Sequence, residues 1–185
     1  DGKLADGVVY FNIIEQAAQS LVPIILETLS KQDEDADGDS WNLAKAGAAC
    51  LEAVAQTVGD NVVGLVLPFV TANINSTEWH TKEAAVMAFG MILDGPSSEK
   101  LMPIVTGALP VLVTCLSDRS THVKDTCAWV VGRICEYHSL AITPDIFPKM
   151  VEGLSLALDD QAATVSAQAC YAVHNLAQAC EDESE

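Results

Sequence analysis

The sequence has few aromatic and few basic residues. Phe, Trp and Tyr make up 5% of its 185 residues, and 9 Lys and Arg stand against 26 Asp and Glu, which gives a formal net charge of −17. A surface this acidic repels phosphate backbones and anionic lipid headgroups, so we expect no nucleic-acid partner. The same electric field attracts basic proteins and peptides, which are therefore the expected class of partner.

The chain also lacks a long apolar run and the motifs of common enzymes. No stretch approaches the ~20 apolar residues that cross a bilayer, so no membrane insertion is expected. HExxH, GxSxG, P-loop and Gly-rich dinucleotide-binding motifs are missing, and the four histidines stand apart from one another. We predict no catalytic residue, no cofactor and no metal, and hence a protein that is not an enzyme.

No CxxC motif occurs among the cysteines, which lie at positions 50, 115, 127, 135, 170 and 180. Half of the chain is hydrophobic, enough for a sizeable core without disulfides, so reduced thiols and an intracellular compartment are expected. The first residues, Asp1-Gly2-Lys3, include no initiator Met, and we interpret both ends as cuts in a longer protein.

The abundant residues are Ala, Val and Leu, which favour helices packed on helices. One short phrase occurs four times, with an apolar residue before a proline and Leu or Ile six positions after it. The prolines are Pro23, Pro68, Pro110 and Pro148, and the interval between them shortens along the chain. We expect these prolines in equivalent places of successive helical hairpins.

A second set of helices, rich in small residues, is predicted between the phrases, over 42–58, 78–93, 122–137 and 163–180. The segment that begins at Lys82 aligns with the one that begins at Lys124. We call the separation between these two residues the repeat offset, and it also aligns Gly90 with Gly132. Because glycine costs ~1 kcal/mol in a helix interior, its recurrence predicts a close approach of helices there. The repeat offset also aligns Tyr171 with Trp129.

A two-helix period of about 40 residues is typical of HEAT or armadillo repeats, and HEAT is favoured because each unit has two helices. The predicted fold class is all-α, an α-solenoid of about four HEAT repeats of antiparallel helix pairs. Residues 75–77 are expected to cap the helix that begins near Glu78. The predicted units are an N-terminal remnant of a preceding helix at 1–16 and repeats at 17–58 (with an acidic loop at 31–40), 60–94, 98–138 and 144–181.

The acidic loop is the one unusual connection. Its carboxylates are Asp33, Glu34, Asp35, Asp37 and Asp39. Self-repulsion predicts a solvated link, which is the simplest interpretation. A calcium loop fits at Gly38 but fails at Ala44, where an EF-hand needs a bidentate Glu. The functional interpretation is an electrostatic lure for Lys and Arg on a partner.

An aromatic row accompanies the loop. Trp41, Trp129 and Tyr171 are expected on the concave side of the solenoid, where exposed rings would stack on the cationic side chains of a basic helix. Core packing is the ordinary alternative for such rings. Glu83 and Asp125, one turn before the aromatic register, are expected to flank the row.

Four segments, in this order, resemble the importin-β family: Asp33–Asn42, Glu83–Gly90, Asp94–Pro96 and Ala128–Glu136. The resemblance covers residues 17–180. It implies a central HEAT-repeat segment that contains the family's acidic loop, about a fifth of a nuclear transport receptor. Such a receptor wraps the basic importin-β-binding helix of the importin-α adaptor, or binds cargo directly, and releases it when Ran-GTP binds.

By the same resemblance, the acidic-loop residues contact Ran or the basic helix, and Trp41 and Trp129 belong to the inner surface. Tyr171 departs from the family, which commonly has Trp there. The family's other partners are phenylalanine-glycine nucleoporins, for which no residue of this chain is assigned. The implied location is the cytoplasm and nucleus, with the nuclear envelope and nuclear pore. The alternative is a generic HEAT-repeat scaffold or assembly subunit unrelated to transport, with the loop a mere insertion.

Overall fold

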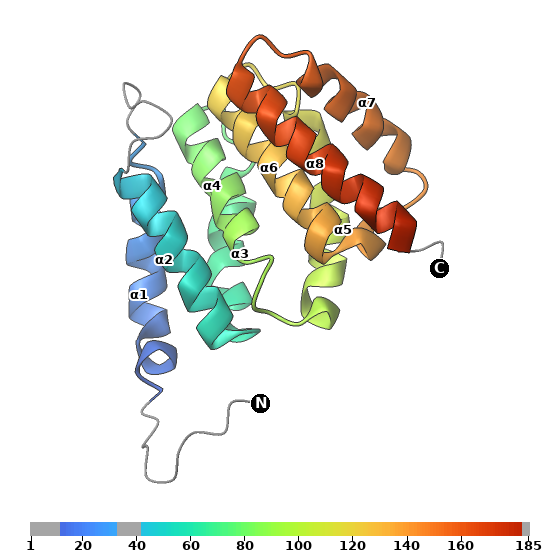
Figure 1. Ribbon diagram of the computed structural model, residues 1–185. Helices are drawn as coiled ribbons and strands as arrows, with labels where there is room; N and C mark the ends of the chain where they lie inside the picture. The colour runs from blue at the N-terminus through green and yellow to red at the C-terminus, as the bar shows by residue number, and fades with distance from the viewer. Residues whose placement is uncertain (1–11, 33–41, 183–185) are drawn as a thin grey trace.

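The computed structural model describes residues 12–32 and 42–182, and in these residues it contains helices and turns but no strand (Figure 1). None of the helices in this part of the chain has the length and apolarity to cross a membrane. The helices are α1 (Ile13–Leu29), α2 (Leu43–Val58), α3 (Asn61–Asn73), α4 (Trp79–Met91), α5 (Ser98–Cys115), α6 (Thr121–Tyr137), the 3₁₀ turn η1 (Ser139–Ala141), α7 (Phe147–Leu158) and α8 (Ala163–Asp182).

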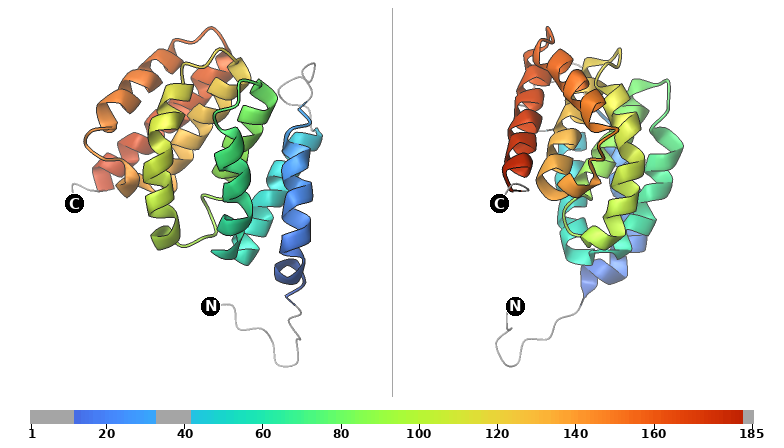
Figure 2. Two further views of the ribbon diagram at one scale, coloured as in Figure 1. Left: turned by 180° about the vertical axis from the view of Figure 1, so that it is seen from behind. Right: turned by 90° about the vertical axis from the view of Figure 1, so that its right-hand side faces the viewer.

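The helices alternate between two layers. Figure 1 shows α2, α4, α6 and α8 side by side in one layer, and the view from behind in Figure 2 shows α1, α3, α5 and α7 in the other. We call the layer of α1, α3, α5 and α7 the first layer and the other the second layer. Each first-layer helix forms a hairpin with the second-layer helix that follows it, and the hairpins share one continuous hydrophobic core. The predicted all-α solenoid of stacked helix pairs is confirmed.

The two layers differ in how closely neighbouring helices approach. Consecutive second-layer helices are all in contact, whereas α3 and α5 in the first layer barely touch. Small side chains at the second-layer contacts, such as the fully buried Ala84, Ala128 and Ala172, allow the short distances. The stack therefore curves toward the second layer, which forms the concave face.

The expectation that all four prolines occupy equivalent places is wrong for the last of them. Pro23, Pro68 and Pro110 lie in the second half of their helices, one to two turns before the end. Pro148 lies in the first turn of α7, where a missing N–H costs no hydrogen bond. The interval from Pro110 to Pro148 is shorter than the repeat offset by about one helical turn, so the phrase has moved by that amount.

Two further expectations need correction at helix starts. Residues 13–16, predicted to belong to an N-terminal remnant, are the first turn of α1. The cap of α4 is Glu78 and not residues 75–77: its carboxylate accepts the backbone N–H groups of His80 at 3.1 Å and Thr81 at 2.8 Å. The helix pairs follow the order of the predicted repeats, whose boundaries stay a prediction.

Because Glu78 caps α4, the stability of the fold depends on pH. Hydrogen bonds from the His80 ring and from the Thr81 N–H and hydroxyl lower the pKa of Glu78 from 4.5 to about 2. Because the pKa of Glu78 is lower in the folded protein, its ionised carboxylate stabilises the fold fully at pH values above 4.5. This contribution disappears as the pH falls toward about 2. We expect Glu78→Ala to lower the free energy of unfolding by ~0.5–1.5 kcal/mol at pH 7.

Urea unfolding of both proteins between pH 7 and pH 2 checks this expectation. The difference between wild type and Glu78→Ala should shrink as the pH falls below 4.5. Glu99→Ala serves as a control, because Glu99 lies in the first turn of α5 while Ser97 caps that helix. A Glu78 effect that is constant across the pH range would contradict the assignment.

Candidate interaction face

The acidic-loop residues Asp33, Glu34, Asp35, Asp37 and Asp39, together with Trp41, lie outside the described residues. The other predicted site residues lie on the second layer: Glu83 on α4, Asp125 and Trp129 on α6, and Tyr171 on α8. The two described residues of the aromatic row, Trp129 and Tyr171, therefore lie on second-layer helices.

The rings of Trp129 and Tyr171 lie in equivalent places, each over a glycine of the preceding second-layer helix. A Cβ added to Gly90 would lie 2.4 Å from Cζ3 of Trp129, and one added to Gly132 would lie 2.5 Å from Cδ1 of Tyr171. The predicted register of these residues is confirmed. The recurrent glycines are needed because each one gives room for the aromatic ring of the next hairpin.

Trp129 is half-buried and already has a cation on its ring. The guanidinium carbon of Arg133 lies 5.2 Å from the Trp129 ring centroid and 5.1 Å from that of Tyr137. Arg133 is itself only 8% exposed and pairs through Nη1 with Oε1 of Glu52 on α2, so this contact reaches across α4. The Trp129 ring is therefore less open than the sequence interpretation supposed.

Tyr171 is also half-buried, and α6 fixes its orientation. The phenolic hydroxyl donates to Oε2 of Glu136 at 2.5 Å. Burial, followed by this interaction with Glu136, raises the pKa of Tyr171 to about 12. Asn175 donates from Nδ2 to the Gly132 carbonyl at 3.2 Å, one turn further along α8. A Trp in this place would have no phenolic oxygen to bind Glu136, so the tyrosine gives this chain an additional contact between α6 and α8.

Glu83 does not flank an open row, and that expectation is wrong. Its side chain is buried, with 7% of the residue exposed. It accepts a hydrogen bond from the Thr126 hydroxyl at 2.7 Å and another from Nε2 of Gln32. Burial raises the pKa of the Glu83 carboxyl against these hydrogen bonds. Gln32, the second residue of the acidic loop, also donates to the His80 carbonyl at 3.0 Å, so Glu83 and His80 together anchor the start of that loop.

Asp125 lies at the edge of the same region and is partly buried. Burial raises the pKa of its carboxyl, while a hydrogen bond with Thr164 and the charges of His122 and Lys45 oppose the rise. Its Oδ1 is buried without a hydrogen-bond partner. Asp125 therefore retains an acceptor that its neighbours do not use.

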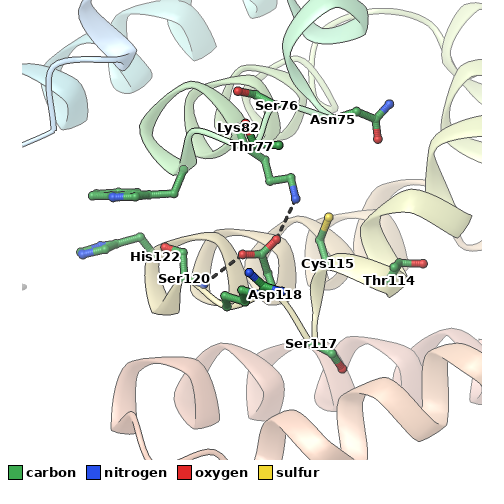
Figure 3. A pocket seen from close by; sticks show the side chains of 12 residues that line it. Asn75, Ser76, Thr77, Lys82, Thr114, Cys115, Ser117, Asp118, Ser120 and His122 are labelled. Carbon is green, nitrogen blue, oxygen red and sulfur yellow. Dashed lines mark hydrogen bonds and ion pairs between the residues drawn. The ribbon is translucent and has the colours of Figure 1, made fainter.

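Sequence reasoning missed an aromatic stack at the start of α4. The Trp79 ring stacks with the rings of His80 and His122, with centroid distances of 3.7 Å and 4.4 Å. Trp79 and His122 line a cavity of about 890 Å³ between α4, α5 and α6 (Figure 3, where His122 is labelled). The signal was present in the sequence, since His80 and His122 are separated by the repeat offset.

The same cavity contains one of two repeated ion pairs. Nζ of Lys82 lies 2.7 Å from Oδ2 of Asp118 (Figure 3), and Lys124 pairs with Asp160 in the next hairpin. Oδ1 of Asp118 accepts the Ser120 N–H at 2.9 Å, and Asp160 accepts a turn N–H in the same way. Both Lys and both Asp recur at the repeat offset, so this ladder was also visible in the sequence.

Comparison with known proteins gives concordant results. Residues 79–134 match the HEAT-like repeat family. Importin subunit beta-1 of Schizosaccharomyces pombe is 47% identical over 161 residues, which cover 86% of this chain and 18% of that protein. A second match is a solved structure of Kap95p, described as the one in which Kap95p binding induces the switch loops of RanGDP to adopt the GTP-bound conformation. It is 34% identical, with a TM-score of 0.90 over 94% of this chain and 20% of that one.

A third match is the Kap95:Nup1 complex, which is 34% identical, with a TM-score of 0.89 over 94% of this chain and 20% of that one. Kap95p is yeast importin-β. The chain thus spans about a fifth of the length of the relatives it matches. The matches in sequence and in structure extend over most of the chain. This chain belongs to the importin-β family, in which it corresponds to a stretch of HEAT repeats.

Proposed function

We propose that this chain is part of a nuclear import receptor and that its concave face and acidic loop bind a basic helix. The helix would be the importin-β-binding domain of importin-α or a basic segment of a cargo protein. Ran-GTP would bind at the acidic loop and compete for it. The observation that carries the proposal is the alignment of half-buried aromatic rings, Trp129 and Tyr171, on the concave layer of a chain with a net charge of −17.

Charge and ring geometry support this choice of ligand. Glu136 is exposed beside Tyr171 on α6, and the partly exposed Asp94 lies in the connection that follows α4. A peptide rich in Lys and Arg could pair with these carboxylates while its aliphatic stems pack along the ring edges. Long-range attraction would mainly accelerate association and would weaken as salt screens it.

The relatives support the wider proposal. Kap95p engages RanGDP in one matched structure and Nup1 in another, so we extend Ran and phenylalanine-glycine nucleoporins to this chain as proposed partners. A role without enzymatic chemistry and a location shared between cytoplasm, nucleus and nuclear pore follow from the same proposal. Nucleoporin-binding residues are not assigned.

Titration calorimetry with an Arg- and Lys-rich helical peptide tests the proposal. We expect binding at low salt that weakens roughly tenfold when ionic strength rises from about 50 to 300 mM. Replacing the five acidic-loop carboxylates with Asn and Ser should weaken low-salt binding by roughly tenfold as well.

A matched variant separates a local site from net charge. It neutralises an equal number of exposed carboxylates on the first layer and its connections: Glu15, Glu27, Glu99, Asp145 and Glu152. This variant should keep most of the affinity, because the removed charges lie away from the concave face. Equal losses in both variants, or no loss in the loop variant, would favour the scaffold alternative.

A further inference from the structure

One ion pair of the second layer joins two hairpins that are not neighbours. Nη1 of Arg133 on α6 lies 2.5 Å from Oε1 of Glu52 on α2. Figure 1 shows α4 between these two helices. Helix α2 packs on α4, and α4 packs on α6, whereas α2 and α6 themselves touch at most slightly. The pair therefore connects the first hairpin, α1–α2, to the third, α5–α6, past the helix that separates them.

The cation of this pair is held in place by its own helix. Trp129, Arg133 and Tyr137 follow one another at intervals of four residues, so their side chains share one face of α6. The guanidinium carbon is about equally far from the two ring centroids, at 5.2 Å and 5.1 Å, so both rings contact the cation. Arg133 could therefore follow a movement of α2 only by giving up favourable contacts with two rings.

The guanidinium depends on Glu52 for its charge partner. Arg133 is 8% exposed, and its Nε and Nη2 are buried without a hydrogen-bond partner in the part of the chain that the structure describes. If α2 moved away, the carboxylate would leave a buried cation behind, which is unfavourable. The ion pair therefore opposes any movement that separates α2 from α6.

The ion pair spans the smallest contact between consecutive helices of the second layer. The contact of α2 with α4 is less extensive than that of α4 with α6, and that of α6 with α8 is the largest. Repeats of a solenoid contact mainly their immediate neighbours, so a joint with little shared surface is where the stack bends most easily. When a curved stack straightens there, a helix of the inner layer moves away from the next helix but one. An ion pair across that distance resists this straightening.

We propose that Arg133 and Glu52 form a clasp that fixes the curvature of the stack by holding the first hairpin to the third. With the clasp closed, the joint between α2 and α4 cannot straighten. With the clasp open, the joint gains freedom and the concave face widens. The Lys82–Asp118 and Lys124–Asp160 pairs differ from the clasp, because each joins neighbouring hairpins. The clasp acts in the free chain, whether or not the concave face binds a basic helix.

Spin labels on two native cysteines measure this curvature. Cys50 on α2 and Cys170 on α8 are exposed, and Cys180→Ser removes the other exposed thiol. The remaining cysteines are buried and stay unlabelled in the folded protein: Cys115, Cys127 and Cys135. Because α8 has its largest contact with α6, the distance between the two labels follows the position of α2 relative to α6. Pulsed electron paramagnetic resonance gives both the mean and the width of that distance.

The clasp variant combines Glu52→Ala with Arg133→Met in this labelled background, so that no charge is left unpaired. We expect its mean label distance to exceed that of the parent protein by ~2 Å or more, with a broader distribution, while its unfolding midpoint stays close to the parent value. The matched control combines Lys82→Met with Asp118→Asn. It removes a partly buried pair between neighbouring hairpins and keeps an acceptor for the Ser120 N–H. The control should keep the parent distance, because α4 and α6 also pack directly.

Two outcomes would overturn the proposal: an unchanged distance distribution in a folded clasp variant, or an equal lengthening in the control variant. If the clasp variant does not fold, Glu52→Gln takes its place, because the amide keeps the shape of the carboxylate but loses its charge and so weakens the bond to the guanidinium. The label distances of Glu52→Gln should then spread beyond the parent distribution, and a distribution identical to that of the parent would refute the proposal.

Discussion

Gly95→Ala is expected to lower the free energy of unfolding by ~3 kcal/mol or more, because both conformation and space forbid a side chain there. Gly95 lies between α4 and α5 with a φ of +119°, in the region that favours glycine. A Cβ would lie 2.5 Å from the Ala55 carbonyl oxygen and 2.8 Å from the Gln56 nitrogen. These are backbone atoms of α2, which cannot rotate away.

Two other glycines provide matched controls for this substitution. A Cβ added to Gly64 in α3 or to Gly107 in α5 would meet no atom within 4 Å. Ala at either position should stabilise the protein by ~0.5–1 kcal/mol, because Ala is the better helix former. Urea unfolding followed by circular dichroism measures all three variants. A Gly95→Ala protein with the wild-type midpoint would show that the connection can move away from α2.

The sequence predicted those features that repeat at a fixed offset. The repeat offset placed Trp129 and Tyr171 in register and identified Gly90 and Gly132 as close contacts, as the structure shows. Periodic features are predictable because each hairpin repeats the same local packing problem. Pro148 shows the limit of this reasoning, since its phrase could slide by one turn while the hairpins stayed in register.

Contacts made once, between distant residues, could not be predicted. Glu83 appeared to flank the aromatic row because its helix position fits that face, yet its partners Gln32 and Thr126 lie 51 and 43 residues away in the sequence. Arg133 and Glu52 are separated by 81 residues and do not share the repeat offset. Whether the side chain at a given helix position is buried depends on such partners, and periodicity alone does not specify the partners.

The Arg133–Glu52 contact leads to the second large expected effect. Glu52→Ala should lower the free energy of unfolding by ~2–3 kcal/mol, since it leaves a buried guanidinium without its counter-charge. Nε and Nη2 of Arg133 already lack hydrogen-bond partners, so no other group in the described residues replaces the carboxylate. The Glu52 side chain is 31% exposed, and solvent near it keeps the loss below the ~3–5 kcal/mol of a fully buried pair.

A double-mutant cycle identifies the cause of that loss. If the unpaired charge is responsible, adding Arg133→Met to Glu52→Ala should restore stability to within ~1 kcal/mol of the wild type, because Met keeps an apolar stem over the Trp129 and Tyr137 rings. Glu27→Ala is the control, since its pair with Lys31 is exposed and should contribute less than ~0.5 kcal/mol. A double mutant as unstable as Glu52→Ala would contradict this explanation. The loss would then come from packing of the Glu52 side chain on α2, and not from an unpaired charge on Arg133.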